Sequence, residues 1–278
     1  MALFFGEIVE PSTRAIFDEF SDEEENAVER PKRINIPVRD LCFRQLNVSW
    51  NGGDKNLPPI IEVCFIVQGR LSLAFAEICL IDETCVKIGE INVTQSEDNN
   101  EGVPEYPKEK VTPSRIYRDN HNVICLISPS LSSTLGYQLV GETITPLLKL
   151  SKKIVILTND SVYNYKTHFL QNLPPAFIKE LKTSHGSHSH IAEPIETPNF
   201  ITGIPAAVFT WCEIFKKDAS AFICYSDQEK LDSITAEPYI SVLRKVNKDI
   251  IKKENLDFNK KTIYGKPGMI GGSSNIYI

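Results

Sequence analysis

Four short apolar runs constrain the fold of this chain more than any other feature. They are rich in β-branched residues and occupy residues 60–67, 123–127, 154–157 and 221–225. A strand that is apolar on both faces needs a covering layer on each side, which is typical of a parallel sheet flanked by helices. A further strand is expected near residues 86–93.

Apolar residues at helical spacing separate these runs. The pattern predicts helices over 71–81, 135–150 and 205–215, a short helix over 174–181, and a helix within 233–251 whose Pro238 lies in its first turn. Strands that alternate with helices favour one α/β domain of three layers with a mostly parallel central sheet. We assign residues 34–258 to this domain, with a polar surface loop over 95–110 and an irregular stretch over 183–198.

Both ends of the chain are expected to be flexible tails. Residues 1–33 combine an apolar patch, which includes Phe4, Phe5 and Gly6, with a window rich in Asp and Glu. Such a segment buries too little apolar surface to offset its ordering entropy. It is either a solvated tail or a flexible tether that carries a short docking motif at Phe4-Phe5-Gly6.

The last residues, 259–278, form the second tail. A Gly/Ser-rich stretch over 265–274 precedes Ile276, Tyr277 and Ile278, the last of which carries the main-chain carboxylate. An apolar residue and a tyrosine on a loose tether suit docking into a pocket of another protein, because a tyrosine removes a large area from water. The alternative is an ordinary edge strand or frayed end.

Composition excludes several classes of function. The net charge of −6 argues against nucleic-acid binding, and no apolar run approaches the length of a membrane span. The N-terminus lacks the basic residues of a secretory signal, so we expect a cytoplasmic protein, with nuclear or endoplasmic-reticulum association as alternatives. The seven cysteines should then be reduced thiols, and they contain no C-x-x-C pair.

The strand ends carry the candidates for chemistry, because ligands gather at the carboxyl ends of parallel strands. The polar residues there are Gln68, Ser128, Ser130, Thr158, Asn159, Asp160, Ser226 and Asp227. An enzyme would use Asp160 or Asp227 as a base and Ser128 or Ser130 as a nucleophile. No G-x-S-x-G elbow is present, and such residues commonly form turns and helix caps, so we expect no catalytic residues.

Cofactor and metal signals are weak. Gly69 is a single-glycine turn rather than a dinucleotide fingerprint, and Lys266 is followed by proline, unlike a phosphate loop. His185, His188 and His190 form the best metal candidate by residue type, but they lie in a Gly/Ser-rich loop that does not preorganise them. We therefore expect no cofactor and no metal.

Several short segments together resemble the eukaryotic proteasome assembly chaperone 1 family. They are residues 4–9, 165–167, 204–208 with Trp211 and Cys212, 225–227, 230–232, 235–237 and 274–277. Their order along the whole chain carries the resemblance, whereas residues 34–60 and 95–118 show none.

The resemblance implies a non-catalytic chaperone of 20S proteasome assembly. It implies a heterodimer with proteasome assembly chaperone 2 on the proteasome α-ring, whose tails enter pockets between α subunits and keep activators off. The family's hydrophobic–tyrosine–any-residue motif maps onto Ile276, Tyr277 and Ile278. Two alternatives remain: an α/β small-molecule enzyme of phosphorylase- or hydrolase-like type, and a scaffold that binds a different partner through the same tail.

Overall fold

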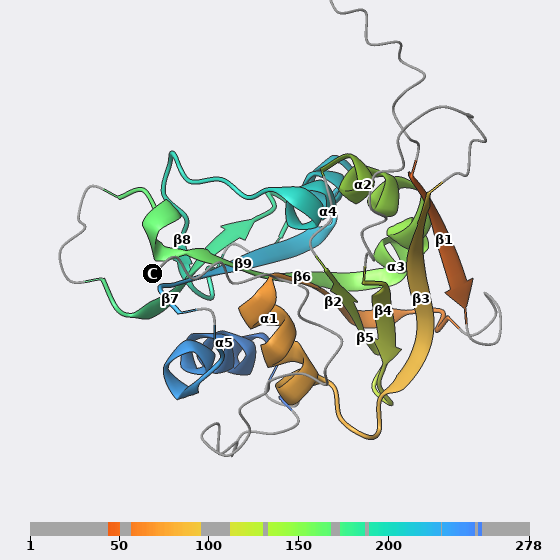
Figure 1. Ribbon diagram of the computed structural model, residues 1–278, viewed down its shortest axis with the longest axis horizontal. Coiled ribbons are helices and arrows are strands. Elements are labelled where there is room, and N and C mark those ends of the chain that lie inside the picture. The colour runs from red at the N-terminus through yellow and green to blue at the C-terminus, as the bar shows by residue number, and fades with distance from the viewer. Residues whose placement is uncertain are drawn as a thin grey trace, which may run out of the picture. The chain divides into compact units, whose positions relative to one another are not determined.

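The computed structural model describes residues 44–50, 57–95, 112–129, 133–167, 173–186, 189–228, 230–247 and 250–251. Within these residues the chain forms a nine-stranded sheet in the order β1-β3-β4-β5-β2-β6-β9-β7-β8 (Figure 1). The surface loop predicted at 95–110 lies almost wholly outside the described residues. The predicted domain boundaries, after residues 33 and 258, also lie outside them.

The centre of the sheet is parallel, as the apolar runs predict. It consists of β5 (Val123–Ser128), β2 (Ile61–Gln68), β6 (Ser151–Ser161) and β9 (Asp218–Ser226). Phe65 of β2 is level with Cys125 on one side and Val155 on the other, and all three side chains are buried. These strands are covered on both faces, which explains why their sequences do not alternate between apolar and polar residues.

Both flanks of the sheet are antiparallel, which the sequence did not indicate. On the β5 side lie β4 (Ser114–Arg118), β3 (Val86–Gln95) and β1 (Arg44–Trp50), each antiparallel to its neighbour. On the β9 side β7 (Ala176–Lys182) is antiparallel to β9, and the two-residue β8 (Glu193–Pro194) pairs parallel to β7 at the edge.

Helices cover both faces and complete the three predicted layers (Figure 1). One layer contains α2 (Ser133–Gln138), the π-helix η5 (Leu139–Ile144), α3 (Thr145–Leu150) and α4 (Gly203–Ile214). The other contains α1 (Arg70–Phe75), which continues as the π-helix η4 (Ala76–Leu80), and α5 (Ser233–Val246). The α/β fold class is therefore confirmed.

The prediction of a short helix over 174–181 is wrong, because this segment is strand β7. Its backbone pairs with β9 from Ala176 opposite Ser226 to Lys182 opposite Ser220. The pairing satisfies main-chain groups of β9 that would otherwise face outward at a sheet edge. This long-range pairing outweighs the local preference of Pro174 and Pro175 for the first turn of a helix.

The expected place of Pro238 in the first turn of its helix is also wrong. Helix α5 begins at Ser233, where Asp232 accepts a hydrogen bond from the Thr235 main-chain N–H and Thr235 completes a capping box. Pro238 therefore lies in the helix interior. It cannot donate to the Ile234 carbonyl, and Ile234 is half exposed, so water can take the missing bond.

Candidate functional site

The strand order places a crevice at one point of the sheet. From β2 the chain passes through α1, β3 and β4 to β5 on one side, and then through α2 and α3 to β6 on the other side of β2. Such a reversal is a topological switch point, where the connections on either side leave the carboxyl ends of two strands uncovered. Here Gln68 ends β2, and Thr158 lies in the last part of β6, one residue beyond the pairing of Val67 with Leu157.

A pocket of about 720 Å³ occupies this point. Gln68, Thr158, Asn159 and Asp160, all predicted strand-end candidates, line it together. Ser128, Ser226 and Asp227 are described but do not line it, and Ser130 lies outside the described residues. The pocket is also lined by Gly69, Tyr163, Asn164, Lys166, Asn199, Phe200, Ile201, Thr202, Gly203, Ile223 and Tyr225.

Strand register sets which side chains share the floor of the pocket. Thr158 is level with Ile223, and Asp160 is level with Tyr225 on the neighbouring strand β9. Side chains two residues apart on a strand point to the same face. Thr158, Asp160, Ile223 and Tyr225 therefore share the face that α4 covers.

Asn159 points the other way and occupies the start of α1. Its Oδ1 accepts hydrogen bonds from the main-chain nitrogens of Leu71 at 3.1 Å and Ser72 at 3.3 Å. Gly69 makes this approach possible: its φ is +100°, and a Cβ atom there would lie 2.3 Å from Asn159 Oδ1. In nucleotide-binding α/β proteins the corresponding N–H groups face a phosphate. Here the Asn159 side chain accepts the hydrogen bonds of these N–H groups.

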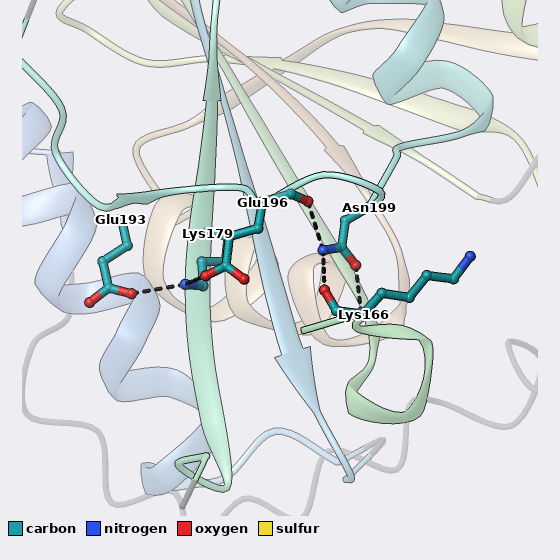
Figure 2. A network of polar contacts seen from close by, with 5 residues as sticks. All are labelled: Lys166, Lys179, Glu193, Glu196 and Asn199. Carbon is teal, nitrogen blue, oxygen red and sulfur yellow. Dashed lines mark hydrogen bonds and ion pairs between the residues drawn. The ribbon is translucent and has the colours of Figure 1, made fainter. Parts of the chain in front are cut away.

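Two loops form the rim, and Asn199 joins them (Figure 2). Asn199 Oδ1 accepts from the Lys166 main-chain nitrogen at 2.7 Å, while its Nδ2 donates to the carbonyl oxygens of Lys166 and Glu196, at 2.8 Å each. The Lys166 amine lies 5.8 Å from the centre of the Phe200 ring. The two hydrogen bonds to Lys166 join the loops, and the third, to Glu196, lies within the loop that carries Asn199.

Behind the rim lies a buried lysine. Lys179 Nζ donates to Glu193 Oε2 at 2.9 Å and Glu196 Oε1 at 3.4 Å (Figure 2). It also lies 5.5 Å from the centre of the Tyr165 ring, which packs against Phe177 and Tyr225. Burial acts to lower the pKa of Lys179, but the hydrogen bonds to Glu193 and Tyr165 raise that pKa overall, so the lysine stays charged.

The predicted catalytic candidates that the structure describes are not paired with one another as nucleophile and base. Ser128 Oγ is buried and hydrogen-bonded to Ser114 Oγ at 2.7 Å rather than to a base. Asp160 accepts hydrogen bonds from Ser161 N and from Asn164 Nδ2, each at 2.7 Å, as a turn-forming residue does. Asp227 is exposed and lies outside the pocket.

The histidines separate in space. His185 faces Ser184 and Glu213, and His190 Nδ1 lies 3.4 Å from Glu180 Oε2, whereas His188 lies outside the described residues. In the part of the chain that the structure describes, no three His, Cys, Asp or Glu side chains are grouped as metal ligands would be. No helix there is both long and apolar enough to cross a membrane.

Several predicted site residues have no described position, and several rim residues were not predicted. Ile276, Tyr277, Ile278, Phe4, Phe5, Gly6 and Lys266 lie outside the described residues. The rim residues Tyr163, Asn199 and Phe200 were missed, because contacts between two irregular loops leave no periodic signal. Lys166 lies in a segment that carried the family resemblance, which was the only sequence signal for this part of the site.

These features define a three-layer α/β protein with an internally capped switch-point helix and an open pocket beside it. A solved structure with a similar fold is a protein of unknown function from Thermoplasma acidophilum, with a TM-score of 0.50 and 15% identity over 72% of this chain and 81% of that one.

Sequence comparisons give the family. The PAC1 family model, described as "Proteasome assembly chaperone 4", matches residues 1–278. Human proteasome assembly chaperone 1 is 26% identical over 260 residues, covering 87% of this chain and 88% of the relative. The Xenopus tropicalis protein of the same name is 29% identical over 266 residues, with coverage of 87% and 88%. The chain belongs to this family of proteasome assembly chaperones, as its short motifs predict.

Proposed function

We propose that this protein is a non-catalytic, cytoplasmic chaperone of 20S proteasome assembly that binds the α-ring through its C-terminal residues. It pairs with a second, related assembly chaperone, proteasome assembly chaperone 2. The observation that carries the proposal is the family match over residues 1–278, which includes Ile276, Tyr277 and Ile278. When the C-terminal residues occupy pockets between α subunits, they keep activators off an unfinished proteasome core.

The chemistry of the last three residues supports this role. Burying a tyrosine removes ~150–250 Å² from water, worth at most ~4–6 kcal/mol. A charge-assisted hydrogen bond to the Ile278 carboxylate adds ~1.5–3 kcal/mol. Ordering the tail costs ~1–2 kcal/mol per residue, so one tail binds weakly and reversibly. A weak, reversible contact is what a factor that must leave the finished particle needs.

The spacing between the motif and the folded part also fits. If residues 265–275 behave as a Gly-rich linker, as their composition predicts, their r.m.s. reach is roughly 18 Å. A tail of that reach raises its effective concentration near an adjacent pocket into the mM range once the body of the protein has docked. Body and tail then bind more tightly together than either does alone.

The engagement of the strand-end groups supports a non-catalytic role. Ser128 is hydrogen-bonded to Ser114 and Asp160 to a turn, so neither is a poised nucleophile or base.

Deleting Ile276–Ile278 tests the proposal. In a pull-down with proteasome α subunits, the truncated chain should retain far less α subunit than the full chain, while its thermal unfolding midpoint stays unchanged. The matched control deletes residues 271–273, which leaves the motif intact and reduces the reach only to roughly 16 Å. Full retention of α subunits by the chain that lacks the motif would refute the proposal.

A second experiment tests the partners. Mass spectrometry of proteins that co-purify with the intact chain should identify a second assembly chaperone together with α subunits. Replacing Phe4 and Phe5 with alanine shows whether the N-terminal motif contributes. Co-purification with an unrelated set of proteins would favour the scaffold that uses the same tail for a different partner.

A further inference from the structure

Two side chains in the switch-point pocket are almost fully buried, and their polar groups have no hydrogen-bond partner among the described residues. Gln68 is 7% exposed, Tyr225 is 2% exposed, and both line the pocket. Neither the Gln68 amide nor the Tyr225 hydroxyl has a hydrogen-bond partner among the described residues. Among the described residues, the fully buried polar atoms without a partner are Glu180 Oε1, Asp218 Oδ1 and Ser220 Oγ. The polar atoms of Gln68 and Tyr225 are not of this kind, so they keep access to the pocket, where water or a ligand can take their hydrogen bonds.

These groups converge from different strands on one volume. Gln68 ends β2 and Tyr225 lies near the end of β9, with Thr158 of β6 between them in the sheet. Gly203, at the start of α4, lies against the Gln68 amide: a Cβ atom built there would be 3.2 Å from Gln68 Oε1. The start of α4 packs closely against the amide and limits the space around it. The site is therefore built rather than incidental.

The charges around the pocket favour an uncharged ligand. The lining residues contain one carboxylate, Asp160, and one amine, Lys166. The main-chain N–H groups of Leu71 and Ser72, which could hold a phosphate, already donate to Asn159. The buried polar side chains that line the pocket are a neutral amide, Gln68, and a phenol, Tyr225, and burial raises the pKa of Tyr225 to about 12, which keeps it a donor.

The rim favours a planar ligand. Tyr163 is 87% exposed and Phe200 is 66% exposed, and both line the mouth of the pocket. Exposed aromatic rings at the edge of a polar pocket offer flat surfaces on which a planar group can stack. Asn199 joins the backbones of the two loops that carry these rings, so both rings belong to the same edge of the pocket.

We propose that the switch-point pocket binds a neutral, planar, hydrogen-bonding small molecule of nucleoside size, with the Gln68 amide and the Tyr225 hydroxyl as its buried contacts. The volume of about 720 Å³ lies in the usual range for such ligands, ~300–1,000 Å³. The ligand is bound and not transformed. The proposal does not depend on the C-terminal residues, and its failure would leave the chaperone role untouched.

Calorimetric titration of the full chain with adenosine, inosine, uridine and cytidine tests the proposal. At least one nucleoside should bind, and its 5′-monophosphate should bind no more tightly, because Asn159 occupies the helix start that would hold the phosphate. Absence of binding by all four nucleosides at millimolar concentration would overturn the proposal. Binding of the monophosphate tenfold tighter than the nucleoside would overturn it as well.

Two substitutions locate the site, each with a matched control. Gln68→Leu and Tyr225→Phe should each weaken nucleoside binding roughly tenfold, since each removes one buried hydrogen bond. Gln228→Leu and Tyr137→Phe make the same chemical changes at residues that do not line the pocket, and should leave binding unchanged. Tyr225→Phe keeps the packed ring, so it remains informative if Gln68→Leu fails to fold. Unchanged affinity in Tyr225→Phe would overturn the assignment of the site.

Discussion

Asn159 Oδ1 lies 3.1 Å from the main-chain nitrogen of Leu71 and accepts its hydrogen bond, although the two residues belong to different elements, β6 and α1. The same oxygen accepts from the Ser72 nitrogen. One side chain thus caps the helix and ties it to the centre of the sheet.

Loss of this cap should destabilise the fold. Asn159→Ala removes the acceptor for two buried main-chain donors, and we expect the free energy of unfolding to fall by about 1–2 kcal/mol in chemical denaturation. Asn159→Asp keeps an acceptor at the same point and should lose much less. Equal stability of the alanine variant and the unsubstituted protein would contradict the capping role.

Gly69 should be coupled to Asn159. Gly69→Ala places a Cβ atom 2.3 Å from Asn159 Oδ1 at a φ of +100°, so we expect a loss of about 1–3 kcal/mol. In the double variant Gly69→Ala/Asn159→Ala the clash with Asn159 Oδ1 is removed, while the φ of +100° and the 3.2 Å approach to the Asn159 main-chain nitrogen remain, so the total loss should be smaller than the sum of the two single losses. Gly141→Ala is the control: a Cβ there meets nothing within 4 Å, and it should be neutral or stabilising. Strict additivity of the two losses would be evidence against the contact.

Glu213 should make the stability depend on pH in the acid range. Its carboxylate accepts hydrogen bonds from the Ser184 hydroxyl and from the Ser184 main-chain nitrogen, and these lower its pKa below the usual 4.5. A carboxyl group whose pKa is lower in the folded state stabilises the fold above pH 4.5, and this contribution is lost as the pH falls through the folded-state value. Glu213→Gln should therefore reduce stability at neutral pH and show a shallower acid loss. Glu237→Gln, on the exposed surface of α5, removes the same charge as a control.

A free carboxylate on Ile278 should be necessary for binding to the α-ring. A peptide tag added after Ile278 moves the charge away from Ile276 and Tyr277, and we expect strongly reduced recovery of α subunits in a pull-down. The same tag placed before Met1 should leave recovery unchanged. Normal recovery with the C-terminal tag would mean that the carboxylate takes no part.

The described cysteines should differ sharply in reactivity. Burial raises the pKa values of Cys64, Cys212 and Cys224 to about 12 each, and Cys79 and Cys125 are also buried. Because the thiolate is the reactive species, a thiol reagent at pH 8 should label these five only after unfolding. Cys85 is half-buried and should react sooner. Rapid labelling of all the thiols in the native protein would show that the core opens readily.

Local sequence patterns predicted the helices and strands whose own apolar residues require burial. The apolar runs are β2, β5, β6 and β9, because both faces of each of these strands must be buried. The segments with helical spacing include α1 and α4, because one apolar stripe of each helix must be buried. The antiparallel flanks were not predictable in this way. Strand β7 carries the buried polar residues Lys179 and Glu180, whose partners come from residues 190–196 in a separate loop.

The sequence by itself determined the three layers, and it predicts a docking role for Ile276, Tyr277 and Ile278, since burial preference and motif chemistry are properties of short segments. Only the tertiary structure decided that Gln68 and Tyr225 face one pocket, that Asn159 caps α1, and that residues 176–182 form a strand. Those outcomes depend on hydrogen bonds and packing between segments distant in the chain. No local pattern encodes which of the possible partners will be nearby once the sheet has formed.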